Sequence, residues 1–170
     1  MIKNKNNGFS LLELLLVVAV GAILILAGLA IYRNITNNTQ NNEAVRLLNV
    51  IKQEVVKVYQ GQSSYGTADL EPLSVNMDAI PAANLDGSNI VTPFASGTAA
   101  VSVMGANETF EVTFGDVPQD ACIRLFTSYT SDDKDFSGLS AGGAIAMADL
   151  TPAQANATCG DTTDMTWSFQ

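Results

Sequence analysis

The chain has 170 residues, a formal net charge of −9, and a hydrophobic content of 47%. From Gly61 to the end only Arg124 and Lys134 are basic, against fourteen Asp and Glu, which excludes nucleic-acid binding by this acidic head alone, since phosphate contacts need Lys and Arg. The sequence contains no histidine, phosphate-binding loop, zinc-ligand spacing or nucleophile elbow. It therefore predicts no enzyme, no catalytic residue, no cofactor and no metal site.

The N-terminal region joins a basic stub to a long apolar run. Residues 1–8 contain Lys3 and Lys5 and stop at Gly8, and the apolar run then begins at Phe9. Eighteen uncharged residues from Leu14 to Ile31 would span roughly 27 Å as a helix, against a hydrocarbon core of about 30 Å. We therefore expect 9–32 to form a transmembrane helix, with its basic end in the cytoplasm and the rest of the chain outside.

A second helical pattern follows over 33–60. Its first part, 34–43, is rich in Asn and Thr and has no apolar period, so it is either a solvated stretch of one long helix or a short linker. A stripe at steps of three and four then indicates an amphipathic helix, and Gly61 supplies its stop. The stripe consists of Ala44, Leu48, Ile51, Val55 and Val58.

The composition and the apolar–polar patterns of residues 61–170 indicate a globular α+β head. Alternation of apolar and polar residues predicts half-buried strands at 101–103, 109–114 and 165–169. Two short helices are predicted between them, one opened by Pro118 with Cys122, Leu125, Phe126 and Tyr129 on one face, and one capped by Thr151. Because a small sheet needs a cover, the amphipathic helix is expected to pack on an antiparallel sheet.

The two cysteines, Cys122 and Cys159, allow a single intramolecular pairing. Export to an oxidising compartment favours a disulfide, and two buried free thiols are the alternative. The bond would join the two short helices and bound the region 122–159.

The junction Gly8-Phe9-Ser10-Leu11-Leu12-Glu13, with a basic leader before it and an apolar helix after it, resembles the prepilin cleavage motif of type IV pilins and the related type II secretion pseudopilins. The rest of the chain is similar to these proteins in layout: helix extension, sheet and C-terminal disulfide region. The cysteine-bearing short helices resemble the type IVb branch, whereas the eight-residue leader and the Phe at the cut resemble type IVa.

The resemblance implies a processing route and a set of partners. A prepilin peptidase would remove residues 1–8 by cutting between Gly8 and Phe9, and would methylate the new amine of Phe9. The chain would wait in the inner membrane until the pilus assembly machinery draws it into an extracellular filament, a helical homopolymer of the same chain. Such a pilus (fimbrium) serves adhesion, motility, DNA uptake or conjugation in the family.

Glu13 is the one carboxylate inside the apolar run. A charge at the bilayer centre costs at least about 2.5 kcal/mol, and in a low-dielectric helical bundle it needs a cation or must be neutral. The resemblance implies that the amine of Phe9 on a neighbouring subunit is this cation, so that Phe9 and Glu13 together form an assembly contact. The alternative is that Glu13 lies at headgroup depth and is tolerated there.

Two other interpretations compete with a major pilin. The chain could be a minor pilin or a pseudopilin. It could also be a secreted or periplasmic binding protein whose ordinary signal peptide is cut near Gly28-Leu29-Ala30, although the long apolar run and Glu13 disfavour this. Separately, the acidic run 132–135 could ligate calcium, but it lacks EF-hand spacing, and a solvated loop is the better interpretation.

Overall fold

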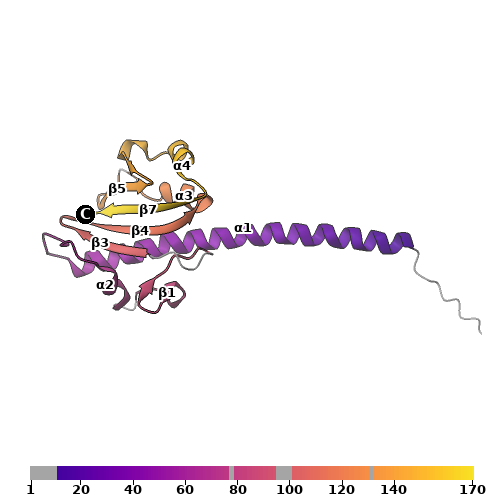
Figure 1. Cartoon of the computed structure of the whole chain (residues 1–170), viewed down its shortest axis with the longest axis horizontal. Helices are drawn as coiled ribbons and strands as arrows, with labels where there is room; N and C mark the ends of the chain where they lie inside the picture. Colours follow the sequence, from indigo (N-terminus) through magenta and orange to yellow (C-terminus); the bar gives the residue numbers. More distant parts are fainter. Residues whose placement is uncertain (1–10, 77–78, 95–100, 131) are drawn as a thin grey trace, which may run out of the picture. The chain divides into compact units, whose positions relative to one another are not determined.

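The computed structural model describes residues 11–76, 79–94, 101–130 and 132–170. Its contacts divide the chain into two units, Met1–Asn38 and Thr39–Gln170, which are described separately below. One helix, α1 (Leu11–Val58, 48 residues), contributes to both (Figure 1). The polar stretch 34–43 is therefore helical, which decides between the two possibilities left open by its composition. The helix ends before Gly61, whose φ of +88° is a left-handed conformation suited to glycine.

In the first unit, α1 is apolar on all sides from Leu14 to Ile31. Its large hydrophobic side chains from Leu11 to Ile35 are mostly exposed, Leu11 at 77% and Ile23 at 65%. By length and composition this helix could cross a membrane. A helix that is apolar all round needs lipid or other helices around it, as predicted from the run Leu14–Ile31.

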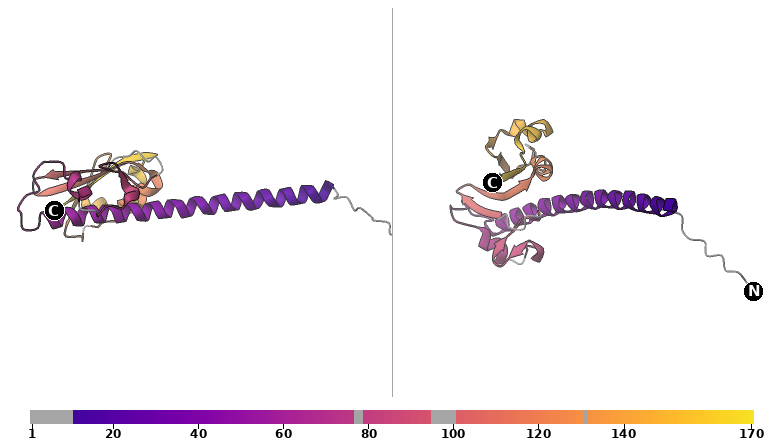
Figure 2. Two further views of the ribbon diagram at one scale, coloured as in Figure 1. Left: turned by 90° about the horizontal axis from the view of Figure 1, so that it is seen from below. Right: turned by 45° about the vertical axis from the view of Figure 1, so that its right-hand side comes forward.

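The second unit is an α+β head built on a five-stranded antiparallel sheet with strand order β3-β4-β7-β5-β6. Its central strand β7 pairs with β4 on one side and β5 on the other (Figures 1 and 2). The strands are β3 (Val101–Ala106), β4 (Thr109–Pro118), β5 (Phe136–Ala141), β6 (Ala144–Ile145) and β7 (Thr162–Phe169). The predicted strands β3, β4 and β7 are thus confirmed.

Smaller elements complete the head. Before the sheet lie α2 (Glu71–Asn76), a 3-10 turn η1 (Ala82–Asn84), and a two-stranded hairpin of β1 (Leu85–Asp86) and β2 (Asn89–Ile90). Between the later strands lie α3 (Gln119–Phe126), a second 3-10 turn η2 (Met147–Asp149) and α4 (Pro152–Thr158). The short elements α2, η1, β1 and β2 have no clear sequence period, and none of the four was predicted.

The core combines the α1 stripe with one face of the sheet. Ala44, Leu48, Ile51 and Val55 are fully buried, and they share a single hydrophobic cluster with the inward residues of the strands. Aromatic side chains dominate the sheet side of this cluster, because alternate positions of β4 and β7 point inward. They are Phe110, Phe114, Trp167 and Phe169, all at most 1% exposed. The expected packing of the amphipathic helix on an antiparallel sheet is confirmed.

The two short cysteine-bearing helices formed largely as predicted. Thr151 caps α4, since its hydroxyl accepts a hydrogen bond from the Gln154 N–H at 3.3 Å, and Pro152 is the first helical residue. The other helix is shorter than expected: α3 ends at Phe126, and Tyr129 lies beyond it. The Ser128 hydroxyl donates to the Leu125 carbonyl, and this side-chain bond competes with continuation of the helix.

The outer edge of β3 is covered by a short strap, residues 65–70. Backbone N–H groups of Leu70, Gly105 and Asn107 donate across this edge to the carbonyls of Val103, Ala68 and Gly66. A Cβ atom on Gly105 would lie 2.5 Å from the Tyr65 carbonyl oxygen and 2.9 Å from that of Gly66. The strap can therefore approach β3 this closely only because residue 105 is glycine.

We expect Gly105→Ala to lower the free energy of unfolding of the head by about 1–3 kcal/mol, because the added methyl group must displace backbone rather than a side chain. Urea unfolding of the detergent-solubilised chain measures the change. Gly138→Ala is the matched control in the same sheet, since its Cβ would approach nothing closer than 3.9 Å. If the two variants have equal free energies of unfolding, the strap can move away from the added methyl group without loss of stability.

Candidate functional site

The predicted processing and assembly residues lie at the start of α1. Glu13 occupies the first turn of the helix as described and is exposed. Gly8 and Phe9 lie outside the described residues, so the cleavage position and the pairing of Phe9 with Glu13 remain predictions.

The disulfide between Cys122 and Cys159 is present and closes the C-terminal region of the head. Cys122 lies on α3 and Cys159 directly follows α4, with their Cα atoms 5.8 Å apart. The Gln119 side-chain amide also donates to the Cys159 carbonyl at 3.1 Å. Both sulfurs are buried, so the bond ties two short helices together inside the core rather than at its rim.

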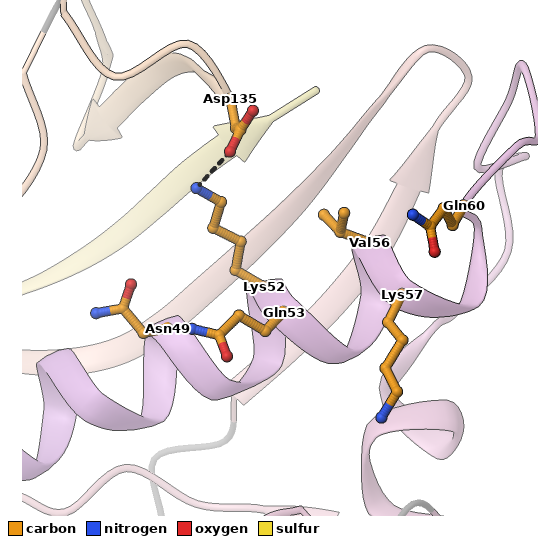
Figure 3. A pocket seen from close by; sticks show the side chains of 7 residues that line it. All are labelled: Asn49, Lys52, Gln53, Val56, Lys57, Gln60 and Asp135. Carbon is orange, nitrogen blue, oxygen red and sulfur yellow. Dashed lines mark ion pairs between the residues drawn. The ribbon is translucent and has the colours of Figure 1, made fainter.

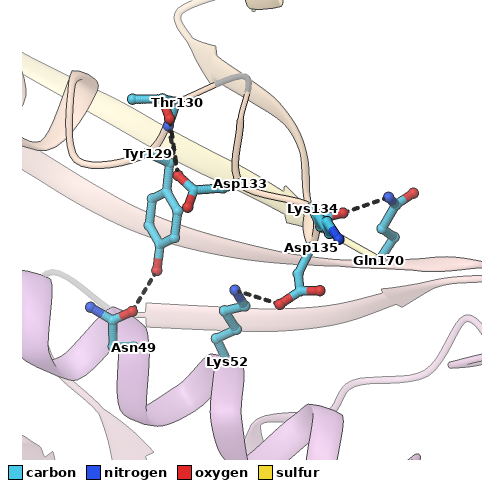
Figure 4. Close-up of polar contacts among 8 residues, drawn as sticks. All are labelled: Asn49, Lys52, Tyr129, Thr130, Asp133, Lys134, Asp135 and Gln170. Carbon is cyan, nitrogen blue, oxygen red and sulfur yellow. Dashed lines mark hydrogen bonds and ion pairs between the residues drawn. The ribbon is translucent and has the colours of Figure 1, made fainter.

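A polar network fastens the 129–135 loop to α1 (Figure 4). The Tyr129 hydroxyl donates to the Asn49 side-chain oxygen at 2.8 Å, and the Lys52 ammonium lies 3.2 Å from a carboxylate oxygen of Asp135. Asp133 turns back into its own loop, where it accepts from the N–H of Thr130 at 2.8 Å. The acidic run 132–135 is therefore partly structural, since two of its three carboxylates are engaged within the head.

Lys52 connects this network to the aromatic core. Its ammonium lies 5.6 Å from the centre of the Tyr129 ring and 5.3 Å from that of Phe169. Only 16% of the Lys52 side chain is exposed. A partly desolvated ammonium over two rings gains a cation–π attraction, which adds to the ion pair with Asp135.

Burial raises the pKa of Tyr129 to about 12, and the negative charge of Asp133 acts in the same direction. An unfolded tyrosine ionises near pH 10. Above pH 10 the unfolded chain therefore loses this proton while the folded chain keeps it, and the head loses stability as the pH rises from 10 to 12.

We expect Tyr129→Phe to abolish this component of the alkaline destabilisation, and to cost about 1 kcal/mol at pH 7 through loss of the hydrogen bond to Asn49. Urea unfolding at pH 7, 10 and 11.5 measures both effects, with Tyr32→Phe in the exposed part of α1 as the control. If the stability of Tyr129→Phe falls above pH 10 as steeply as that of wild type, Tyr129 is not the source of the alkaline destabilisation.

A pocket of about 440 Å³ opens beside this network on the outer face of α1 (Figure 3). Its charged groups are Lys52, Lys57 and Asp135. The Lys57 side chain is 66% exposed and its ammonium lies 3.5 Å from a Glu54 carboxylate oxygen. The remaining lining residues are Asn49, Gln53, Val56 and Gln60. Amide and ammonium donors thus dominate the wall that α1 contributes.

The network and the pocket were not predicted. The sequence placed Asn49, Gln53 and Lys57 only on the polar faces of a helix, and Asp135 only in an acidic run. The Tyr129–Asn49 bond joins residues 80 positions apart, and no local pattern signals such a pairing.

The head and helix together define the fold of a type IV pilin. TcpA, a type IV pilin from Vibrio cholerae El Tor biotype, superposes with a TM-score of 0.54 and 18% identity over 76% of this chain and 98% of that one. The type IV b pilin from Salmonella typhi gives a TM-score of 0.58 with 17% identity, over 76% and 97% of the two chains. At these identities the likeness concerns the fold.

Sequence comparison supplies the family. The model described as "PilS N terminal" matches residues 38–170, and the prokaryotic N-terminal methylation motif matches residues 3–29. The toxin coregulated pilin of Vibrio cholerae is 23% identical over 166 residues, which cover 94% of this chain and 74% of that protein. The chain belongs to the PilS family and is a type IV pilin.

Proposed function

We propose that this chain is a structural subunit of a type IV pilus, cleaved between Gly8 and Phe9, methylated on the new Phe9 amine, and polymerised into a surface filament. The observation that carries the proposal is the long exposed apolar surface of α1 from Leu11 to Ile35 on a chain with a folded, acidic head. Such a surface needs lipid before assembly and other copies of itself afterwards. The match to the methylation motif over residues 3–29 supports the processing step.

In this proposal the chain has two successive locations. It first lies in the inner membrane with Lys3 and Lys5 on the cytoplasmic side, where a prepilin peptidase reaches Gly8. The assembly machinery then withdraws it into the extracellular pilus, where Glu13 meets the Phe9 amine of a neighbour. The role of the chain is structural rather than enzymatic, as in its relatives that are named pilins.

The test is the composition of filaments on the cell surface. We expect sheared filaments to be visible by electron microscopy in cells that express the chain, to be absent after its deletion, and to contain it as the main component by mass spectrometry. Filaments that contain the chain only in traces in expressing cells, and that persist after its deletion, would indicate a minor pilin or pseudopilin. Release of a soluble head that begins at Ile31 would overturn the proposal in favour of an ordinary exported protein.

A further inference from the structure

Residues 34–40 of α1 lie between the apolar run of the helix and the part of it that packs in the head. Before them, the run Leu14–Ile31 is apolar on all sides and is suited to lipid or to a bundle of helices. After them, Asn41 and Ala44 are the first residues buried in the head, at 5% and 0% exposure. Within residues 34–40 no side chain is buried. Burial therefore stabilises α1 after this segment, and an apolar environment stabilises it before, but neither acts on the segment itself.

The composition of residues 34–40 is unfavourable for a helix. The segment reads NITNNTQ, and six of its seven residues are Asn, Thr or Ile. Asn side chains compete with the helix by bonding to nearby backbone groups, and the β-branched Thr and Ile lose rotamer freedom. Each of these residues lowers the equilibrium constant for helix formation up to about threefold relative to alanine, and the six together lower it roughly a hundredfold or more. The segment contains no charged residue, so no ion pair within it offsets this loss.

A side-chain hydrogen bond to the preceding turn weakens the helix further at this point. The Thr36 hydroxyl donates to the Tyr32 backbone carbonyl at 3.0 Å. Bonds of this kind slightly destabilise helices and often bend them. The Asn49 amide makes a similar bond to the Val45 carbonyl at 2.9 Å, but there the buried Leu48 holds α1 against the sheet. At Thr36 no buried neighbour on the helix compensates.

The contacts of the chain also divide within this segment, after Asn38. Local opening costs least where side chains are exposed and the backbone hydrogen bonds face solvent. Opening at 34–40 leaves residues 11–33 and 41–58 helical, and each of these is longer than the roughly 12–15 residues below which an isolated helix is marginal. It also leaves the buried stripe of the head in place, because that stripe begins at Ala44. The helix can therefore open here without loss of the packed head.

The proposed function places the same helix in two different surroundings. In the bilayer, the direction of the apolar run is set by the lipid, whereas in the filament it is set by the neighbouring helices. A rigid helix of 48 residues would transmit every change of direction to the head. A hinge between the apolar run and the head would allow the two ends of α1 to adjust separately.

We propose that residues 34–40 are a hinge at which α1 opens transiently, so that the apolar run changes its direction relative to the head when the chain passes from the bilayer into the filament. The use of the hinge in assembly rests on the proposed function. The hinge itself is a property of the single chain, because it follows from the composition and exposure of residues 34–40 and from the bond of Thr36 to Tyr32.

Hydrogen exchange of the full chain in detergent micelles measures the local opening. We expect the backbone amides of residues 34–40 to exchange at least about tenfold faster than those of residues 44–55 in the same helix. The triple variant Asn34→Ala/Asn38→Ala/Thr39→Ala should slow exchange in 34–40 about thirtyfold, since each alanine favours the helix about threefold. Gln53→Ala, at an exposed position of α1 in the head, is the control and should leave it unchanged. Equal exchange of the two segments in wild type would overturn the hinge.

Pulsed electron paramagnetic resonance measures the direction of the apolar run relative to the head. Spin labels at Leu24→Cys and Gln53→Cys, both exposed positions, lie on either side of the hinge, and the buried native disulfide is protected from the label. We expect a broad distance distribution for the wild-type hinge and a narrower one for the triple alanine variant. A label pair within the head, Gln53→Cys with Glu111→Cys, should be narrow in both. A narrow distribution across the wild-type hinge would contradict the inference.

Filament yield tests the use of the hinge in assembly. We expect the triple alanine variant to be cleaved normally and to give about fivefold less sheared filament than wild type. The matched control places glycine at the same three positions, which removes the same side chains and keeps the segment easy to open, and should retain most of the yield. Wild-type yield from the alanine variant, or an equal loss in both variants, would overturn the hinge and leave the proposed function intact. Absence of any filament of the wild-type chain would instead overturn the proposed function.

Discussion

Replacement of Glu13 by Gln or Ala is expected to leave cleavage after Gly8 intact and to reduce filament yield by about tenfold or more. In the proposed filament the Phe9 amine of a neighbour would lose its counter-charge inside an apolar helical bundle, and breaking a buried ion pair by removing one partner costs about 3–5 kcal/mol. The measurement compares the mass of the membrane-bound chain, which reports cleavage, with the amount of sheared filament.

The control for this prediction is Glu43→Gln, which removes an exposed carboxylate from the same helix within the head. It should assemble normally. Glu13→Asp keeps the charge on a shorter side chain and should fall between wild type and Glu13→Gln. Normal filament yield from Glu13→Ala would refute the assembly role of Glu13, and would favour a carboxylate that is merely tolerated at headgroup depth.

Removal of the disulfide has the second large expected effect. The bond between Cys122 and Cys159 closes a long loop with a sequence separation of 37, and the chain-entropy model gives about 4 kcal/mol for a loop of this size. We expect the Cys122→Ala/Cys159→Ala double variant to lower the free energy of unfolding of the head by roughly this amount. Urea unfolding of the detergent-solubilised chain, with and without reductant, measures it.

Because both sulfurs are buried, small side chains are suitable replacements in this experiment. Reductant should destabilise wild type to the level of the double variant and leave the variant itself unchanged. The loop contains β5 and β6, so the variant should also become sensitive to proteases between Phe136 and Ile145. If reductant does not change the unfolding of wild type, the disulfide does not contribute to head stability.

The elements that could be predicted are those whose signal is local. The structure confirms the apolar–polar alternation along β4 and β7, because burial alternates between neighbouring residues of a strand. It also confirms the Thr151–Gln154 cap, because that hydrogen bond joins residues three positions apart. The α1 stripe is likewise periodic. The disulfide could be predicted for a different reason, because Cys122 and Cys159 are the two cysteines of the sequence and allow a single pairing.

The elements that escaped prediction depend on distant partners. Apart from Phe136 and Leu139, the residues of β5 are small, and a register shift between Phe136 and Gly138 breaks its alternation. It is a strand because β7 offers it a free edge, which is a tertiary effect that outweighs propensity. The contacts of Tyr129 with Asn49 and of Lys52 with Asp135 follow from this placement, so neither could be inferred beforehand.

We propose that this pilin matures at Phe9 and polymerises through α1. The most direct measurement is the intact mass and N-terminal peptide of the dominant protein in sheared, purified surface filaments. We expect a chain that begins at Phe9, carries one added methyl group on its amine, and retains the Cys122–Cys159 disulfide. A dominant filament protein other than this chain, or a form of this chain that begins elsewhere, would contradict it.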